Sequence, residues 1–598
     1  MVGFQSFGAF AAVASSITSI SLASPLVSES AAANSIQKRQ NDFFVVHPIE
    51  DGGAQPRLNI RDLAGKSENK ELWALYILAI KRLQAVDQKE KLSYYQVAGI
   101  HGQPWIPWDG VPSWTDEPRW GYCPHNGNLF ATWHRPYVML YEQLLYEHVK
   151  AIVGEISDAT TKARYQEIAK TFRVPYWDWA QKLPAGETNI LPGVIINPTV
   201  SITFPNGTAA TVSNPLSSYR FHPLQPEDFP VPENFVAPYD HWEQIIHYPD
   251  DRTSTNPNDN LTGLHQTLNN NLGFARDGIY KLFTNYLPFN LFSNQGPGSD
   301  VNIGNLETVH GSIHDSFRDG HLQFPLTAAF DPIFYLHHAN VDRQIAIWQA
   351  IYPDTFVEPV RAVRQSTFTL DAFAEDPVGA TTPLHPFHKN KKGDFWTSND
   401  VRQISTLGYT YPELADTPSN DTLKARVKAL YEDTRTRTLT RRQNDAAEKT
   451  SRNYNVRISQ PDGFATYLFL GEAGPDPDSW RAESLFAGSF STKFNIITDQ
   501  DREEIKNNPV KGVVPITSSL VKALDAGTLQ NADETAVVSY LKNNLKWRVQ
   551  TTDDEEISPS QVPNFNISIF SHKETVPTSA GEFPKILETK EYPDITGA

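Results

Sequence analysis

Residues 331–342 read DPIFYLHHANVD, and the pentapeptide HGSIH begins upstream at His310. The sequence predicts helices over 306–317 and 331–351 around these two stretches. On a helix, His310 and His314 stand one turn apart and project from one face, where both imidazoles can share a metal ion. The two stretches therefore favour a helical unit organised around a metal site.

Two adjacent histidines lie in the longer stretch. His338 and Asp342 repeat the four-residue spacing, so we expect the carboxylate to orient the His338 ring. His337 points about 100° away from His338 on a helix. The rings of the two neighbours are therefore not expected to face the same metal easily.

A second block of histidines lies nearer the N-terminus and contains His101, Cys123-Pro-His125 and His134. Each block offers three imidazoles without a carboxylate or thiolate ligand, and imidazole ligation suits copper among other metals. An isolated HxxxH pair is also a zinc pattern, so a zinc hydrolase is an alternative. Zinc proteases, however, place a Glu after the first His, where this chain has Gly311.

Further elements follow from periodicity and turn residues. Helices are expected over 71–86 and 129–153, and Pro136 is expected in the first turn of the second, which would then begin a few residues after Leu129. Residues 184–257 are rich in Pro, Asn and Ser and are expected to be loop with little regular structure. In the C-terminal part, strands are expected over 454–458, 464–470 and 485–494, with a hairpin turn at Asp462-Gly463.

The two histidine blocks resemble the copper-binding signatures of the tyrosinase, catechol oxidase and molluscan haemocyanin family. The flanking segments AGIHGQPWIPWDG (98–110) and CPHNGNLFATWHRPY (123–137) most resemble secreted filamentous-fungal tyrosinases. Ordered motifs carry the resemblance across 101–342, and Tyr409-Thr-Tyr411 is similar to the tyrosine motif that closes the catalytic domain of fungal members.

The resemblance implies a four-helix bundle, within a helical domain with long loops, that presents six imidazoles to two copper ions, with dioxygen as co-substrate. The copper ligands it implies are His101, His125 and His134 for the first ion, and His310, His314 and His338 for the second. The family pattern selects His338 of the adjacent pair and leaves His337 a structural role. Phe130 and Phe334, each four residues before a ligand, are expected to lie beside the centre.

Three further residues acquire roles from the resemblance. Family members with Cys-x-His form a thioether from this sulfur, so we expect a bond between Cys123 and His125, with a buried reduced cysteine as the alternative. Glu307 would hold a water that takes the phenol proton. Family members often have Asn where this chain has Gly311, so catechol oxidation is expected to exceed monophenol hydroxylation.

Composition limits the partners of the chain. Its 598 residues exceed what one core usually organises and predict two domains. The formal net charge of −17 repels phosphate backbones and argues against nucleic acid as a partner. No segment beyond the N-terminal region reaches about 18 uninterrupted apolar residues, so no membrane partner is expected. The single cysteine excludes an intrachain disulfide.

The predicted organisation has five parts. They are a signal peptide (1–23), a propeptide (24–39), the dicopper catalytic domain (40–415), a linker with a dibasic site (416–452) and a smaller β-rich lid domain (453–598). A signal peptide implies secretion. Four Asn-x-Ser/Thr glycan acceptors agree with that route, at Asn206, Asn260, Asn420 and Asn566.

Two near-identical dibasic segments flank the catalytic domain, Lys38-Arg39-Gln-Asn-Asp and Arg441-Arg442-Gln-Asn-Asp. We expect a dibasic processing protease to cut at both and to remove the propeptide and the lid. Phe464, after the predicted hairpin turn, is the candidate that would plug the copper entrance. An ordinary core phenylalanine is the alternative.

The expected activity is that of a secreted type-3 copper oxidase of small phenols. It would use dioxygen to oxidise o-diphenols to o-quinones, with weaker ortho-hydroxylation of monophenols. A haemocyanin-like oxygen carrier and an o-aminophenol oxidase are the alternatives with the same kind of site.

Overall fold

The computed structural model describes residues 43–596, apart from 233–234, 297–299, 362–364, 373–375, 434–449 and 493–508. The described residues belong to one compact unit, Phe43–Ala598. The predicted signal peptide, propeptide and both dibasic pairs lie outside the described residues, so they stay predictions, as do the proposed domain boundaries.

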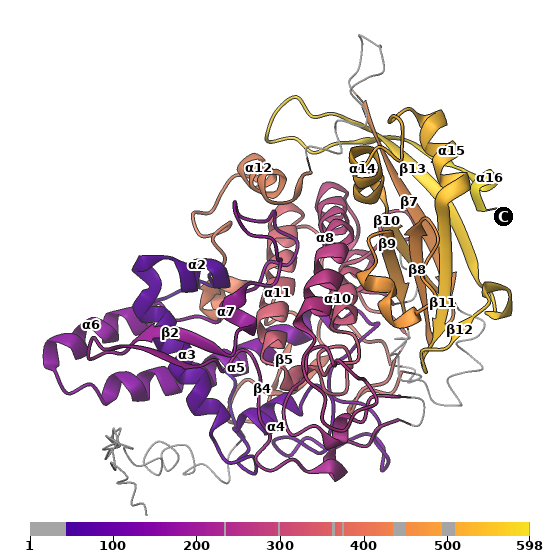
Figure 1. The fold of residues 1–598 in the computed structure, drawn as a ribbon. Helices are drawn as coiled ribbons and strands as arrows, with labels where there is room; N and C mark the ends of the chain where they lie inside the picture. The colour runs from indigo at the N-terminus through magenta and orange to yellow at the C-terminus, as the bar shows by residue number, and fades with distance from the viewer. Residues whose placement is uncertain are drawn as a thin grey trace, which may run out of the picture. The chain divides into compact units, whose positions relative to one another are not determined.

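Helices dominate the first part of this unit (Figure 1). The longer ones are α3 (Lys70–Gln84), α5 (Phe130–Gly154), α6 (Ala159–Lys170), α8 (Leu261–Thr284), α10 (Leu306–His314), α11 (Ile333–Ile351) and α12 (Asn420–Tyr431). Shorter ones are α2 (Ile60–Gly65), α4 (Tyr94–Ala98), α7 (Gly193–Ile196) and α9 (Phe289–Ser293). Helix α5 packs on α3 and α11, while α8 packs on α10, α11 and α12.

Helix α5 begins earlier than its proline suggested. It starts at Phe130, so Pro136 lies inside the helix and not in its first turn. Inside a helix, Pro136 removes the hydrogen bond to the carbonyl of Thr132, and its ring crowds the same carbonyl. Every residue from Phe130 to Tyr146 is buried. Packing of the whole segment therefore outweighs the local loss.

Helix α8 was not predicted, because asparagines and glycines of low helix propensity interrupt its sequence. Asn260 caps it by accepting a hydrogen bond from the Gly263 amide. A Cβ at Gly278 would lie 2.9 Å from Val309 of α10. The glycine that weakens the helix signal thus lets α8 approach the helix that carries two histidines.

The long segment 184–257 contains a hairpin that the sequence analysis missed. Strands β2 (Thr199–Thr203) and β3 (Ala209–Ser213) pair in antiparallel register. The connection contains Asn206-Gly207, and Gly207 has φ +86°. Asn-Gly is a strong hairpin signal, so the pattern was present in a stretch otherwise expected to be loop.

Two small pairings close the helical part. Strand β1 (Gln55–Pro56) runs parallel to β6 (Tyr409–Thr410). Strand β4 (Pro383–His388) pairs with β5 (Phe395–Thr397). The β1–β6 pair joins the start of the described chain to the tyrosine motif.

The C-terminal part contains two four-stranded sheets, as the expected β-rich region required. One has the order β10 (Val510–Pro515), β7 (Thr450–Gln460), β13 (Asn566–Thr575), β14 (Ile586–Glu591). The other has the order β12 (Glu556–Ile557), β11 (Leu545–Thr551), β8 (Phe464–Leu470), β9 (Phe486–Ser491). Apolar residues of both sheets share one core, and a second, smaller apolar cluster lies on β8 and β9. The α-helices among the described residues of this part are α14 (Thr517–Asp525), α15 (Glu534–Asn544) and α16 (Pro593–Thr596).

The turn at Asp462-Gly463 does not form the predicted hairpin. It carries the chain from β7 in one sheet to β8 in the other, because both edges of each strand are taken by other partners. Gly463 has φ +86°, and its amide donates to the carbonyl of Thr492. The turn residue was recognised correctly, but its strand partners were wrong.

The strand-rich part packs on α10, which carries two histidines of the second block, and on α8. Strand β9 contacts α8 and α10, and Arg481 pairs with Asp315, the residue after His314, at 3.2 Å. Asn270 of α8 donates to the Arg481 carbonyl at 3.0 Å. Within the described residues, no helix has both the length and the apolar character needed to cross a membrane.

Candidate metal centre

The second histidine block lies on two helices. Helix α10 begins after Asn305, whose side chain accepts a hydrogen bond from the Thr308 amide. The ring centroids of His310 and His314 are 4.5 Å apart, and their Nε2 atoms are 3.0 Å apart. The ring of His338, on α11, lies 5.0 Å from that of His310. Helical spacing brings the rings of His310 and His314 together, and α11 places His338 beside them, as predicted.

Two histidines of the first block lie on loops. His101 follows α4, and its Nδ1 lies 3.0 Å from the Pro325 carbonyl oxygen. Gly121 packs so closely on the His101 backbone that a Cβ there would clash with the carbonyl oxygen. The ring of His101 lies 5.2 Å from His125 and 5.9 Å from His134, which is near the start of α5.

The two blocks meet in the protein interior. His134 stacks on His338 with ring centroids 4.0 Å apart and planes 15° from parallel. His101 also lies 6.3 Å from His338. All six predicted histidines thus gather in one place, although the two blocks are far apart in the sequence.

Backbone carbonyls fix which ring nitrogen faces this centre. Nδ1 of His134 lies 2.8 Å from the Phe130 oxygen, and Nδ1 of His314 lies 2.5 Å from the Leu322 oxygen. A carbonyl only accepts hydrogen bonds, so Nδ1 carries the proton and Nε2 keeps its lone pair. The contact of His101 with Pro325 has the same effect.

Burial keeps the imidazoles neutral and ready to bind a metal. It lowers the pKa of His125 and His134 to about 3, and that of His314 to about 4. Among the described residues, Nε2 of His101 and both ring nitrogens of His338 have no hydrogen-bond partner. Metal–imidazole bonds are about 2 Å long, so two nitrogens 3.0 Å apart, as in His310 and His314, suit a shared ion. The residues present therefore fit two copper ions.

His337 also reaches the centre, which corrects the expectation from helix geometry. His310, His314, His337 and His338 each offer one nitrogen, and these four nitrogens lie within 4.8 Å of one another. Neighbouring side chains leave a helix in different directions, but rotation about the side-chain bonds changes the direction in which each imidazole points. Both members of the pair can therefore face the histidines of α10.

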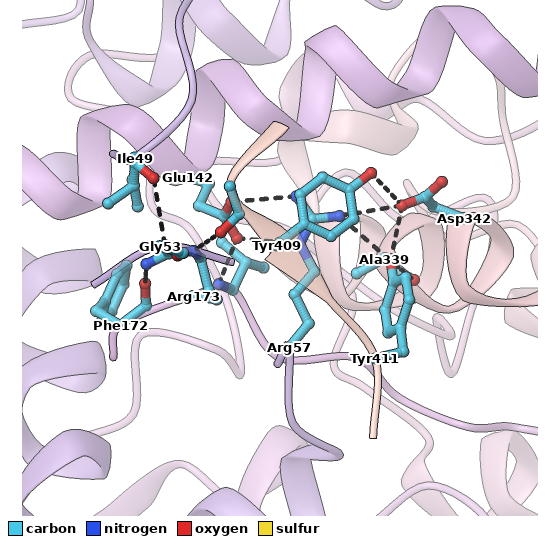
Figure 2. A network of polar contacts seen from close by, with 12 residues as sticks. Ile49, Gly53, Arg57, Glu142, Phe172, Arg173, Ala339, Asp342, Tyr409 and Tyr411 are labelled. Carbon is cyan, nitrogen blue, oxygen red and sulfur yellow. Dashed lines mark hydrogen bonds and ion pairs between the residues drawn. The ribbon is translucent and has the colours of Figure 1, made fainter. Parts of the chain in front are cut away.

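Asp342 does not orient the His338 ring. Its carboxylate lies in a buried cluster of cations and phenols instead (Figure 2). The partners are Arg57 at 3.3 Å, Arg135 at 2.6 Å, Tyr409 at 2.5 Å and Tyr411 at 2.8 Å. Buried guanidinium groups need a counter-charge far more than a neutral ring needs an acceptor.

This cluster sets the charge of Asp342 and the position of α11. Burial alone would raise the pKa of Asp342, but Arg135 and Arg57 outweigh it and hold the pKa below its usual value. Tyr411 also donates to the Ala339 carbonyl, directly after His338, and Arg57 pairs with Glu142 of α5. The cluster thus ties α5, α11 and β6 together beside the centre.

Glu307 is buried one turn before the α10 histidines. One carboxylate oxygen accepts from the Asn126 amide at 2.7 Å and the other from the Gln295 amide at 2.8 Å. Burial raises its pKa to about 7 despite these hydrogen bonds. A Cβ at Gly311 would meet nothing within 4 Å, so the glycine leaves open space on the next turn.

Cys123 and the two phenylalanines lie against the histidines. The Cys123 sulfur is 3.5 Å from His125 Nε2 and 3.4 Å from His134 Nε2, and burial raises the pKa of its thiol. The ring of Phe130 lies 4.9 Å from that of His310. The ring of Phe334 lies 4.2 Å from that of His338.

Phe464 is half-buried at the start of β8. Within the part of the chain that the structure describes, its ring has no recorded contact with a histidine of the centre. Its role as a plug stays a prediction.

Comparison with known proteins agrees with this geometry. The profile described as the common central domain of tyrosinase matches residues 91–351, and that of the tyrosinase C-terminal domain matches 455–569. A tyrosinase of Neurospora crassa is 30% identical over 88% of this chain and 93% of its own length. The chain belongs to the tyrosinase family. It is accordingly a type-3 copper oxidoreductase, with the predicted helical core and smaller β-rich C-terminal region.

Other tyrosinase-family proteins resemble it over different shares of the chain. Polyphenol oxidase 2 of Agaricus bisporus is 34% identical over 60% of this chain and 62% of its own length. The solved structure of recombinant mushroom tyrosinase superimposes with a TM-score of 0.73 at 26% identity, covering 92% of this chain and 98% of that one.

Proposed function

We propose that this member of the tyrosinase family oxidises o-diphenols to o-quinones with dioxygen, and hydroxylates monophenols more slowly. The observation that carries the proposal is the meeting of the two histidine blocks, with His134 and His338 only 4.0 Å apart across the centre. Two sets of neutral imidazoles at this separation can hold two copper ions as a pair.

The histidines of the chain would have the following roles in this reaction. The copper pair, when bound, supplies the redox chemistry that passes electrons from the phenol to dioxygen. His101, His125 and His134 would hold one ion, and His310, His314 and His338 the other. Two catechols lose two electrons and two protons each, and one dioxygen is reduced to two waters.

Glu307 would take the phenol proton through a water in the hydroxylation step. Its two backbone hydrogen bonds hold the carboxylate in a fixed orientation. An amide side chain at position 311, one turn further on, could share this water, whereas Gly311 cannot. This arrangement supports stronger catechol oxidation than monophenol hydroxylation.

The test is a side-by-side assay of oxygen uptake on a monophenol, its catechol and the matching o-aminophenol, with copper quantified. We expect about two copper ions per chain and the fastest turnover on the catechol. Reversible oxygen binding without turnover would indicate an oxygen carrier instead. Preference for the aminophenol would indicate an o-aminophenol oxidase, and zinc in place of copper would refute the proposal.

We also propose that the protein is secreted as a latent precursor. Residues 1–23 would direct secretion, and a dibasic protease would cut after Arg39 and Arg442. The docking of the strand-rich part on α8 and α10, through contacts such as Arg481 with Asp315, supports a role in covering the centre. Activity should rise when residues 443–598 are removed, and unchanged activity would refute the lid.

Glycosylation offers a check on the secretory route. Asn206 is exposed in the β2–β3 turn. Its Oδ1 accepts a hydrogen bond from the Thr208 amide, whereas Asn420 uses Nδ2, the atom that would carry a glycan, to donate to the Ile351 carbonyl. We expect a glycan at Asn206 of secreted protein, detectable as a mass lost on enzymatic deglycosylation and absent from the Asn206→Gln variant.

A further inference from the structure

Helices α10 and α11 carry one more imidazole than the second copper needs. We propose that His337 is a copper-binding residue that holds the ion on the α10–α11 side when this side is filled alone. The inference rests on the proposed copper centre, but it assigns a fourth ligand that the centre's chemistry does not require.

The ring of His337 lies at least as close to the two α10 histidines as the ring of His338 does. Its ring centroid lies 4.9 Å from that of His310 and 4.7 Å from that of His314. The corresponding distances of His338 are 5.0 Å and 5.9 Å. The nitrogens that the four residues offer lie within 4.8 Å of one another, so one ion can contact all of them after small side-chain movements.

Burial shows that the polar ring of His337 needs a partner. The residue has 0% exposure, and neither of its ring nitrogens has a hydrogen-bond partner among the described residues. A buried polar group left unpaired destabilises the folded protein. Its other ring neighbour is Trp179, at 5.9 Å, which offers no lone pair to the ring. A metal ion beside His310 and His314 would remove this cost.

The adjacent histidines face different neighbours. His338 stacks on His134 of the first block. The recorded ring contacts of His337, within the described residues, are with His310, His314, His338 and Trp179. His338 can thus complete the paired centre, while His337 remains on the α10 side of it.

The coordination preference of copper(II) explains why a fourth imidazole would bind. Copper(II) prefers tetragonal sites, which four nitrogens supply better than three. A single ion arriving at α10 and α11 can therefore bind through all four imidazoles. When the first block is also filled, three ligands on each ion are sufficient, and His337 is released.

The experiment isolates the second block in a His125→Ala background, which removes a ligand of the first block. Three forms are compared: the background alone, the background with His337→Phe, and the background with His385→Phe. His385 is a partly buried histidine of β4 with an unpartnered Nδ1, so it controls for the loss of an interior imidazole. Copper(II) alone is titrated into each metal-free protein against a chelator of known affinity.

We expect His337→Phe to weaken copper(II) binding at least 10-fold and to reduce the number of nitrogens coupled to copper in the paramagnetic resonance spectrum. The metal-free protein should melt at the same or a higher temperature, because an apolar ring replaces unpaired nitrogens. The His385→Phe form should bind copper like the background. His337→Gln, which keeps a polar side chain but lacks an imidazole, should weaken copper binding similarly and serves if the Phe variant does not fold.

Equal copper affinity and equal spectra for the background and the His337 variants would overturn the inference. That result is distinguishable from failure of the proposed function. If the unmodified protein bound no copper, the dicopper centre itself would be refuted. If it bound two ions and His337 made no difference to the isolated second block, only the fourth ligand would be lost.

Discussion

The two halves of the centre hold their histidines by different means. On the α10–α11 half, helical spacing sets the relation of His310 to His314, and α11 brings His338 beside them. On the other half, His101 and His125 lie on loops, and only His134 lies on a helix. We call these the helix half and the loop half.

The loop half depends on segments far away in the chain. The Pro325 carbonyl orients His101, Gly121 permits close packing on its backbone, and the Cys123 sulfur lies between two rings. The helix half instead depends on how α11 is anchored, through Asp342 and the start of the helix. The difference predicts which substitutions change metal binding and which change folding.

The largest expected effects come from the ligands themselves. His310→Ala and His125→Ala should each lower catechol oxidation by more than about 100-fold, since even residues that only orient a ligand cost about 10–100-fold. Metal analysis should find about one copper per chain in His125→Ala. In His310→Ala, the helix half keeps three imidazoles and should bind its copper more weakly than the wild type. Full copper content and activity in either would remove that histidine from its half of the centre.

The second prediction tests the anchor of the helix half. Asp342→Asn leaves Arg57 and Arg135 without their shared counter-charge, so we expect a loss of about 3–5 kcal/mol in the free energy of unfolding. Denaturant unfolding of the metal-free protein measures it. Asp416→Asn, which breaks the exposed pair with Arg426, is the control and should leave unfolding unchanged.

The third prediction concerns the start of α11, where buried Asp331 accepts a hydrogen bond from the Ile333 amide and pairs with His247 at 2.6 Å. Burial alone would lower the pKa of His247, but Asp331 and Asp259 outweigh it and raise the pKa to about 9. The raised pKa means that the pair stabilises the protein fully below pH about 6.5, and that this contribution is lost as the pH rises towards 9.

We therefore expect the unfolding free energy of the wild type to fall relative to His247→Gln between pH 6.5 and 9, by an amount on the order of 3 kcal/mol. Parallel pH profiles of the two proteins would contradict this assignment.

The fourth prediction tests the loop half. Cys123→Ala should lower copper retention and catechol oxidation about 10-fold, because His125 loses the sulfur that restrains it. If the thioether forms, the intact mass of the wild type is two hydrogens below that of the unmodified chain. A wild type of unmodified mass would leave Cys123 as a reduced thiol.

The smallest effect is expected at Gly311. Gly311→Asn should raise the ratio of monophenol to catechol oxidation a few-fold, since the open space beside Glu307 admits an amide that can hold the same water. Gly311→Ala is the matched control, because it changes the helix backbone but adds no polar group. An unchanged or lower ratio in the Asn variant would contradict the proposed role of the water.

The same contrast explains what could be predicted from the sequence. Spacing of three or four residues identified the helices of the helix half and paired His310 with His314, whereas His338 was selected by resemblance. The loop half was assigned by resemblance alone, because the positions of His101 and His125 depend on Pro325 and Gly121, which no local pattern connects to them. Helix α8 was missed for a related reason, since the glycine that hides it in the sequence is required by its close contact with Val309.

Other predictions were wrong because the same local sequence pattern is compatible with more than one set of contacts. The four-residue spacing of His338 and Asp342 was correct, but the carboxylate bound two buried guanidinium groups that periodicity cannot reveal. The presence of Arg135 in an otherwise largely apolar segment was the available signal. Likewise, Asp462-Gly463 marked a turn without specifying which strands it would join.

The pairing of β1 with β6 has a consequence for engineering this enzyme. Gln55 and Tyr409 are register partners, so the segment that enters the helical part is held by the segment that leads on to α12. A shortened form that ended before Tyr409 would therefore release both segments, and an engineered catalytic part should keep the chain through Tyr431, the last residue of α12.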